Sequence, residues 1–107
     1  MKSIVKNDVY RKLQQYLDTL PVDYPETESG VEIRILKHLY TPEEAEIALK
    51  LPVFPQEAKN LIGSFKEKDW TLEEFSNKLL TMAKKGSINW YRRSNGTDHF
   101  SIVPMAI

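Results

Sequence analysis

Few side chains in this sequence could catalyse a reaction or bind a metal. The chain has no cysteine, which excludes disulfides, thiol nucleophiles and iron–sulfur ligation by its own residues. The only histidines are His38 and His99, and neither has a partner at the spacing of a metal site. We therefore interpret both as surface or half-buried side chains, and we expect no enzyme activity, no metal site and no cofactor bound in this chain.

A cluster of carboxylates is the other candidate for chemistry. Glu43, Glu44 and Glu46 lie close together just after Thr41-Pro42. Acidic side chains are favoured in the first turn of a helix, where they meet free N–H groups and the positive end of the helix dipole. We therefore interpret the cluster as a solvated helix start.

Polar, basic and aromatic residues near the C-terminus are better suited to binding a partner. In residues 71–85, helical spacing puts one apolar set inward, namely Leu72, Phe75, Leu79, Met82 and Ala83. The opposite side carries Glu73 and Glu74 at its start and basic groups at its end. The candidate contacts with DNA or with a protein partner are Asn77, Lys78, Thr81, Lys84, Lys85, Trp90, Arg92 and Arg93.

Helix signals position these residues. Apolar periodicity predicts helices over residues 8–20, 30–40, 42–51, 56–65 and 71–85. Three of these segments start with the sequence of a capping box, at Ser29, Thr41 and Thr71, each followed three residues later by glutamate. Gly86 ends the last helix after two lysines.

The pattern then changes from helical to alternating, and Asn95-Gly96 predicts a β-hairpin over residues 88–103. Folding about a two-residue turn would place Arg93 opposite Asp98, Tyr91 opposite Phe100 and Arg92 opposite His99. An ion pair and an aromatic pair would then support the register.

This order predicts a mostly helical fold with one small hairpin. We interpret residues 1–107 as a single domain of winged-helix type, in which an extra N-terminal helix precedes a helical core over residues 30–86. The segment 71–85 takes the position of the recognition helix, and the hairpin over residues 88–103 forms the wing.

Composition restricts the class of protein. The length of 107 residues, with 41% hydrophobic and 28% charged residues, is that of one globular domain. We expect a cytoplasmic protein, because the N-terminus does not resemble a signal peptide and no apolar run reaches the roughly 20 residues of a membrane span. Basic and acidic residues are equal at 15 each, whereas DNA-binding domains usually have a basic excess.

Two binding functions remain open. A winged helix that binds DNA puts its recognition helix into the major groove, but here the leading residues are two carboxylates. The alternative is a protein-docking module, suggested by more aromatic residues than one small core is expected to cover and by the acidic segment 18–32, which has no basic residue. A homodimer through the first helix is a variant of the docking hypothesis. No membrane partner is expected.

Several stretches resemble the N-terminal winged-helix-like region of bacterial ferredoxin-type iron–sulfur proteins, which bind two 4Fe-4S clusters. They are residues 10–13, 24–36, 39–46 and 82–86, and the resemblance is specific at 24–46. Residues 52–70 depart from the family pattern. The resemblance implies a role in electron transfer or cofactor delivery, with the clusters in a C-terminal part that this chain lacks. The partner would then be that downstream ferredoxin domain or another protein.

Overall fold

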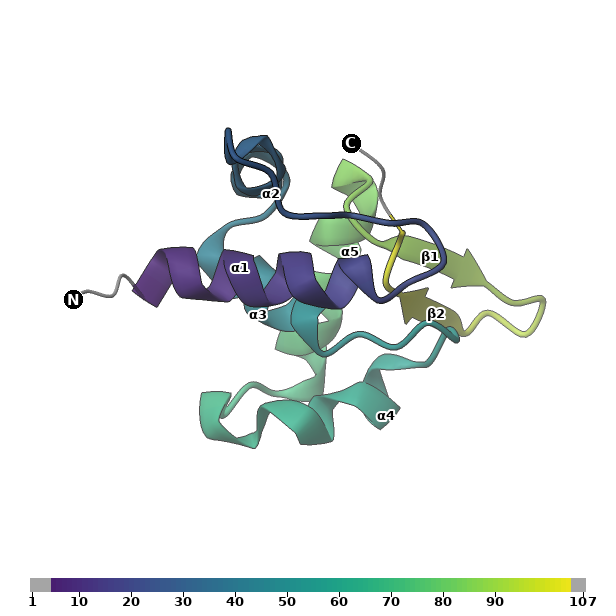
Figure 1. Cartoon of the computed structure of the whole chain (residues 1–107). Helices are drawn as coiled ribbons and strands as arrows, with labels where there is room; N and C mark the ends of the chain where they lie inside the picture. Colours follow the sequence, from purple (N-terminus) through teal and green to yellow (C-terminus); the bar gives the residue numbers. More distant parts are fainter. Residues whose placement is uncertain (1–4, 105–107) are drawn as a thin grey trace. The chain divides into compact units, whose positions relative to one another are not determined.

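The computed structural model describes residues 5–104 of the chain. It is mostly helical with one antiparallel hairpin, as predicted (Figure 1). The elements are α1 (Val5–Asp18), α2 (Val31–Leu39), α3 (Pro42–Leu49), α4 (Ala58–Leu61), the 3-10 helix η1 (Ile62–Lys68), α5 (Leu72–Lys85), β1 (Asn89–Arg92) and β2 (Asp98–Ser101). The fold divides into two compact units, which we describe separately. The first contains α1 to α3, and the second spans Lys50–Val103.

In the first unit, α1 packs against both α2 and α3. Leu13 and Leu17 of α1 are fully buried, and the Tyr10 hydroxyl donates a 2.8 Å hydrogen bond to the Tyr40 carbonyl. The predicted stripe of apolar residues on the first helix therefore faces a core. The helix itself ends at Asp18, two residues earlier than predicted.

The acidic loop after α1 is fixed by buried hydrogen bonds. The Tyr24 ring is fully buried, and its hydroxyl donates to the Glu32 carbonyl at 2.7 Å. The Tyr24 backbone carbonyl accepts a hydrogen bond from the Gln14 side chain at 2.8 Å, and the Tyr24 backbone N–H donates one to the Asp18 carboxylate at 2.9 Å. Burial, with a smaller effect of Glu32, raises the pKa of Tyr24 to about 12. This part of the loop is thus an ordered extension of the α1–α2 packing.

The capping box predicted at Ser29 is wrong. Gly30 is the N-cap residue of α2, in the left-handed conformation and without a side-chain cap bond. Glu32 is fully buried and accepts hydrogen bonds from the Thr27 hydroxyl at 2.6 Å and from Arg11 of α1 at 3.0 Å. Its carboxylate therefore makes tertiary bonds to the loop and α1.

These bonds make Glu32 a stronger acid than an ordinary glutamate. The hydrogen bond from Thr27 lowers the pKa of Glu32 to about 2, against the effect of burial. Backbone N–H groups and Arg11 act in the same direction as Thr27. A carboxylate that is paired in this way stays ionised through the whole range in which an ordinary glutamate takes up its proton.

The second unit is built on a cluster of three aromatic rings. Phe75 of α5 is fully buried, and its ring centroid lies 5.2 Å from that of Phe65 and 5.9 Å from that of Trp70. The predicted helix over residues 56–65 is wrong in its bounds, since α4 begins at Ala58 and the chain continues as η1. The backbone leaves helical geometry at Phe65, which turns that ring into the cluster.

The remaining caps agree with the sequence. Thr71 and Glu74 form the reciprocal capping box at the start of α5, and Gly86 ends that helix with a φ of 85°. In the first unit, Thr41 and Glu44 make the same pair of bonds, at 3.0 and 3.1 Å. Both helices therefore begin where their sequence signal predicts.

The hairpin exists, but its predicted register is wrong by one residue. The observed pairs are Asn89 with Ser101, Trp90 with Phe100, Tyr91 with His99 and Arg92 with Asp98. The loop has three residues, because Arg93 N–H donates to the Thr97 carbonyl and Gly96 N–H donates to the Arg93 carbonyl. Gly96 has a φ of 88°, as expected of a type I turn followed by a left-handed residue. The sequence Asn-Gly fits both this loop and the two-residue one.

A short segment before α4 extends the hairpin. Gln56 and Phe100 exchange two backbone hydrogen bonds, at 3.0 and 2.8 Å, and Ile102 N–H donates to the Pro52 carbonyl at 2.9 Å. Since β2 pairs with β1 on one side and with residues 52–56 on the other, β2 is the central strand and β1 is an edge strand.

Candidate functional site

One group of predicted contact residues lines a hollow beside α5. Asn77, Lys78 and Thr81 lie around it together with Trp70 and Glu74, and its volume is about 380 Å³. The Lys78 ammonium is 5.0 Å from the centre of the Trp70 ring, in the position of a cation–π contact. Lys78 therefore covers an aromatic ring of its own chain and is half-buried, not the fully outward cation that helical spacing predicts.

Lys84 and Lys85 lie in the last turn of α5, directly before Gly86, and both are exposed. There they complement the negative end of the helix dipole.

The second group gathers around Asp98 on the hairpin. Arg92 donates to both carboxylate oxygens of Asp98, at 2.7 and 3.3 Å, and the Trp90 indole N–H donates to one of them at 3.0 Å. The guanidinium of Arg92 lies 5.5 Å from the centre of the Trp90 ring. We call these three residues the hairpin cluster. It holds a tryptophan and an arginine in fixed positions on an exposed strand.

The expected ion pair between Arg93 and Asp98 is wrong, because the three-residue loop puts Arg92 opposite Asp98. Arg93 is exposed and lies at the base of the loop, where its backbone pairs with Thr97. The hydrogen bonds from Arg92 and then from Trp90 lower the pKa of Asp98, and the Asp98 carboxylate raises the pKa of Arg92.

We expect Asp98→Ala to release the Trp90 side chain without unfolding the protein, because all three residues of the cluster lie on an exposed hairpin. The indole N–H resonance of Trp90 should move and the mobility of its ring should rise. The chain has one other tryptophan, Trp70, whose resonance should stay in place and serves as the internal control. Equal movement of both indole signals would contradict the assignment of Asp98 as the local anchor of Trp90.

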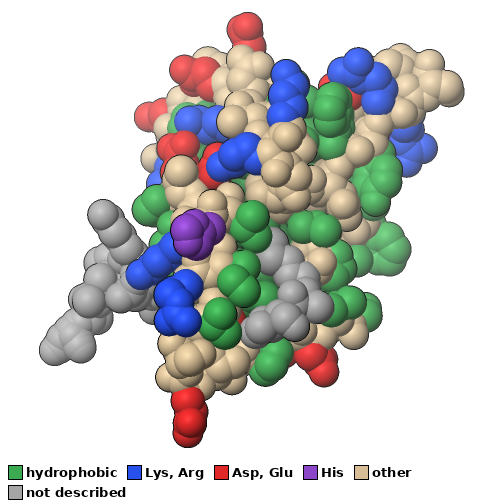
Figure 2. Space-filling view, turned by 90° about the horizontal axis from the view of Figure 1, so that it is seen from above, with side chains coloured by type: hydrophobic (Ala, Val, Ile, Leu, Met, Phe, Trp, Pro, Cys, Tyr) green, Lys and Arg blue, Asp and Glu red, His purple; other side chains and the backbone are tan. Residues whose placement is uncertain are grey.

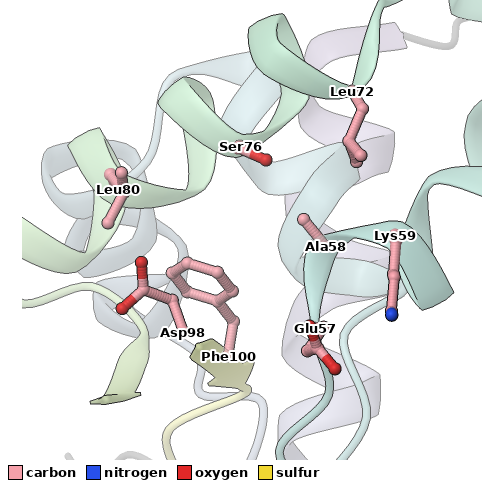
Figure 3. A pocket seen from close by; sticks show the side chains of 8 residues that line it. All are labelled: Glu57, Ala58, Lys59, Leu72, Ser76, Leu80, Asp98 and Phe100. Atoms are coloured by element: carbon pink, nitrogen blue, oxygen red, sulfur yellow. The ribbon is translucent and has the colours of Figure 1, made fainter. Parts of the chain in front are cut away.

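Beside the hairpin cluster lies a second hollow, of about 200 Å³, between α4, α5 and β2 (Figure 3). Figure 3 shows the Phe100 ring between Leu80 and Ala58, with Asp98 next to it. Its remaining lining residues are Glu57, Lys59, Leu72 and Ser76. Leu72 is 47% exposed, so its predicted inward position is wrong. It is the first residue of α5, on the side of Ser76 and Leu80, whereas Phe75, Leu79 and Met82 are buried as predicted.

On the face that Figure 2 shows, lysine and arginine side chains are scattered among acidic and hydrophobic ones. In the first unit, Arg11 is bound to Glu32 at 3.0 Å. Arg11, Lys78 and Arg92 are three of the basic side chains that a DNA-binding surface would need. Each of them already contacts a group of its own chain.

The two histidines first considered for chemistry lie on different elements. His38 is exposed on α2, where it lines a hollow of about 210 Å³ with Arg34 and Lys37. His99 lies on β2, and its Nδ1 atom is buried without a hydrogen-bond partner among residues 5–104. Within residues 5–104, no three histidine, aspartate or glutamate side chains are grouped as metal ligands. No helix in that range has the length and hydrophobicity needed to cross a membrane.

Sequence reasoning missed several exposed apolar side chains of the second unit. Phe54 is 78% exposed, next to the half-exposed Val53, and both precede the backbone pairing at Gln56. The signal was present in prolines 52 and 55, because a residue that precedes proline is disfavoured in helical backbone. Asp98 as the centre of the hairpin cluster was missed because its partner depends on the register.

Comparison with known proteins gives no family for the chain, since no family model, curated protein or solved structure matches it significantly.

Proposed function

We propose that the chain is a non-catalytic protein-docking module and that the hairpin is its contact surface. The observation that carries this proposal is the hairpin cluster. Trp90 is 38% exposed although two interactions hold it in place, and the neighbouring Tyr91 is 50% exposed. Tryptophan, tyrosine and arginine are the residues that most often dominate protein interfaces. Side chains that are already ordered lose less entropy on binding, which favours affinity.

The charges of α5 and the hairpin favour a protein over DNA as the partner. Glu73 and Glu74 are exposed at the start of α5, where a recognition helix would approach bases and phosphates. Arg92 is neutralised by Asp98, and Lys78 lies over Trp70. Binding DNA with useful affinity requires several cations that are available to neutralise phosphates. DNA binding is therefore the alternative function that a titration with DNA must exclude.

We further propose that residues 42–103 form a winged helix. The order of elements supports this fold, because a helix, a strand-like segment at Gln56, two more helical segments and a hairpin follow one another. The resemblance in sequence to the N-terminal region of ferredoxin-type iron–sulfur proteins suggests the kind of partner. It would be a ferredoxin-type domain carrying two 4Fe-4S clusters, in the same or another chain.

A ¹⁵N–¹H chemical-shift titration tests the proposal. We expect a mixed-sequence DNA duplex to cause no shifts at residues 77–85 or 90–99 that persist at physiological salt, because non-specific contacts with phosphates weaken steeply with salt. A ferredoxin-type domain of the family described above, added separately, should shift the signals of residues 90–92. Persistent shifts with DNA at residues 77–85 and 90–99 would overturn the proposal and identify a DNA-binding domain.

A further inference from the structure

The tip of the hairpin contains an asparagine whose side chain can react with its own backbone. Asn95 is the only asparagine of the chain that is followed by glycine, and both residues are exposed. Because glycine has no Cβ, nothing on its α-carbon hinders the approach of its backbone nitrogen to the preceding side chain. A five-membered ring can therefore form between the Gly96 nitrogen and the carboxamide carbon of Asn95.

The Asn95 carboxamide is held with its oxygen toward two donors. The Thr97 hydroxyl donates to Oδ1 at 2.7 Å, and the Thr97 backbone N–H donates to the same atom at 3.1 Å. Since both groups donate, they also fix which end of the amide is oxygen. Within residues 5–104, the Nδ2 atom makes no hydrogen bond. The amide nitrogen is thus free to leave.

This arrangement stabilises the charge that the ring closure creates. When the Gly96 nitrogen attacks Cγ of Asn95, Oδ1 becomes an oxyanion. Donors that already point at such an atom are the main means by which proteins stabilise a tetrahedral intermediate. The two bonds from Thr97 therefore favour the attack.

One bond acts against the reaction. The Gly96 N–H donates to the Arg93 carbonyl at 2.8 Å, and the nitrogen must lose this proton before it attacks. It is a single backbone bond in an exposed loop, and bonds of this kind open at low free energy. The loop therefore reacts through its opened form.

We propose that Asn95 is a site of spontaneous deamidation and that Thr97 accelerates the reaction. The Gly96 nitrogen gives its proton to hydroxide and forms a bond to Cγ of Asn95. The bond from Cγ to Nδ2 then breaks, and Nδ2 takes a proton from water and leaves as ammonia. Water opens the cyclic imide at either carbonyl, which gives aspartate or isoaspartate at position 95.

The modification changes the hairpin. It adds one negative charge to a chain whose net charge is zero, and isoaspartate adds one carbon atom to the backbone of the three-residue loop. The site lies beside the proposed contact surface, but the reaction requires no partner. It is therefore tested independently of the proposed docking function.

Mass spectrometry of the full chain, incubated at mildly alkaline pH, tests the proposal. The peptide with Asn95 should gain the mass that accompanies replacement of NH₂ by OH, faster as the pH rises. Asn60, Asn77 and Asn89 are internal controls, because they lie in helices or a strand and precede leucine, lysine and tryptophan. If Asn95 stays unchanged in the folded chain but reacts in urea, the loop protects it and the proposal is wrong.

Thr97→Val removes one of the two donors and keeps the branched shape of the side chain. We expect the folded variant to deamidate about tenfold more slowly, which is less than the roughly 10²–10³-fold effect of a donor in an enclosed active site because this loop is exposed. Thr97→Ser keeps the hydroxyl and should react at a rate close to that of the unchanged chain. The indole signal of Trp90 checks that the hairpin stays paired in each variant.

Unfolding in urea is the control for the role of Thr97. The unchanged chain and Thr97→Val should then react at equal rates, because the bonds from Thr97 to Asn95 exist only in the folded loop. A folded Thr97→Val that reacts as fast as the unchanged chain, or faster, would overturn the assignment of Thr97. A difference between the two chains that persists in urea would overturn it as well.

Discussion

Phe75→Ala is expected to lower the free energy of unfolding of the second unit by about 3–5 kcal/mol, the usual cost of truncating a buried phenylalanine. Phe75 has no exposed surface, and its ring packs against Phe65 and Trp70. Truncation would remove one of three rings that all contact one another and leave a cavity between α5 and η1. Such a loss is a large part of the roughly 5–15 kcal/mol that stabilises a typical domain.

Leu72→Ala is the matched control, because it truncates an apolar residue of the same helix at an exposed position. Its effect should stay within about 0.5 kcal/mol, as for most surface substitutions. Urea unfolding followed by circular dichroism measures both variants. Similar losses for the two would show that α5 does not bury the face containing Phe75.

Glu32→Gln is expected to make the protein less stable at neutral pH and less sensitive to acid. The pKa of Glu32 is about 2 in the folded protein and about 4.5 when unperturbed. Its contribution is therefore fully present above about pH 4.5 and is lost as the pH falls toward 2. Glutamine removes this titration and turns an amide N–H₂ or a neutral oxygen toward Arg11 and Thr27. We expect this carboxylate to dominate the acid sensitivity of the first unit.

The measurement is the urea midpoint of unfolding at a series of pH values between 2 and 7. Glu28→Gln is the control, since Glu28 is exposed in the same acidic loop. It should leave both the midpoint at pH 7 and its pH dependence close to those of the unchanged protein. A Glu32→Gln profile that is parallel to that of the unchanged protein would refute the assignment.

Sequence signals predicted the structure correctly where the interacting groups lie close together in the chain. The boxes at Thr41 and Thr71 form because both of their partners lie within one turn, and Gly86 ends α5 for an equally local reason. At Ser29 the same signal fails, because the Glu32 carboxylate binds Thr27 and Arg11, and Arg11 lies 21 positions before Glu32 in the chain. The sequence pattern contains no information about that tertiary contact.

The candidate site was predicted in its residue types but not in its pairing. Trp90 and Arg92 were identified, yet their common partner Asp98 was assigned to Arg93. The reason is that Asn-Gly is compatible with both a two-residue and a three-residue loop, and the choice shifts every cross-strand pair by one position. Likewise, periodicity placed Leu72 inward, but the first residue of a helix lies at the margin of the buried stripe.

The three-residue loop of the hairpin has a consequence for how this chain can vary. Arg93 and Thr97 already form the last backbone pair before the loop. Removing Ser94 would leave Asn95-Gly96 as a two-residue turn between that same pair, and adding a residue beside it would give a four-residue loop, both of which hairpins accept. The tip can therefore lengthen or shorten, by evolution or for attaching a label, without changing which side chain faces Asp98.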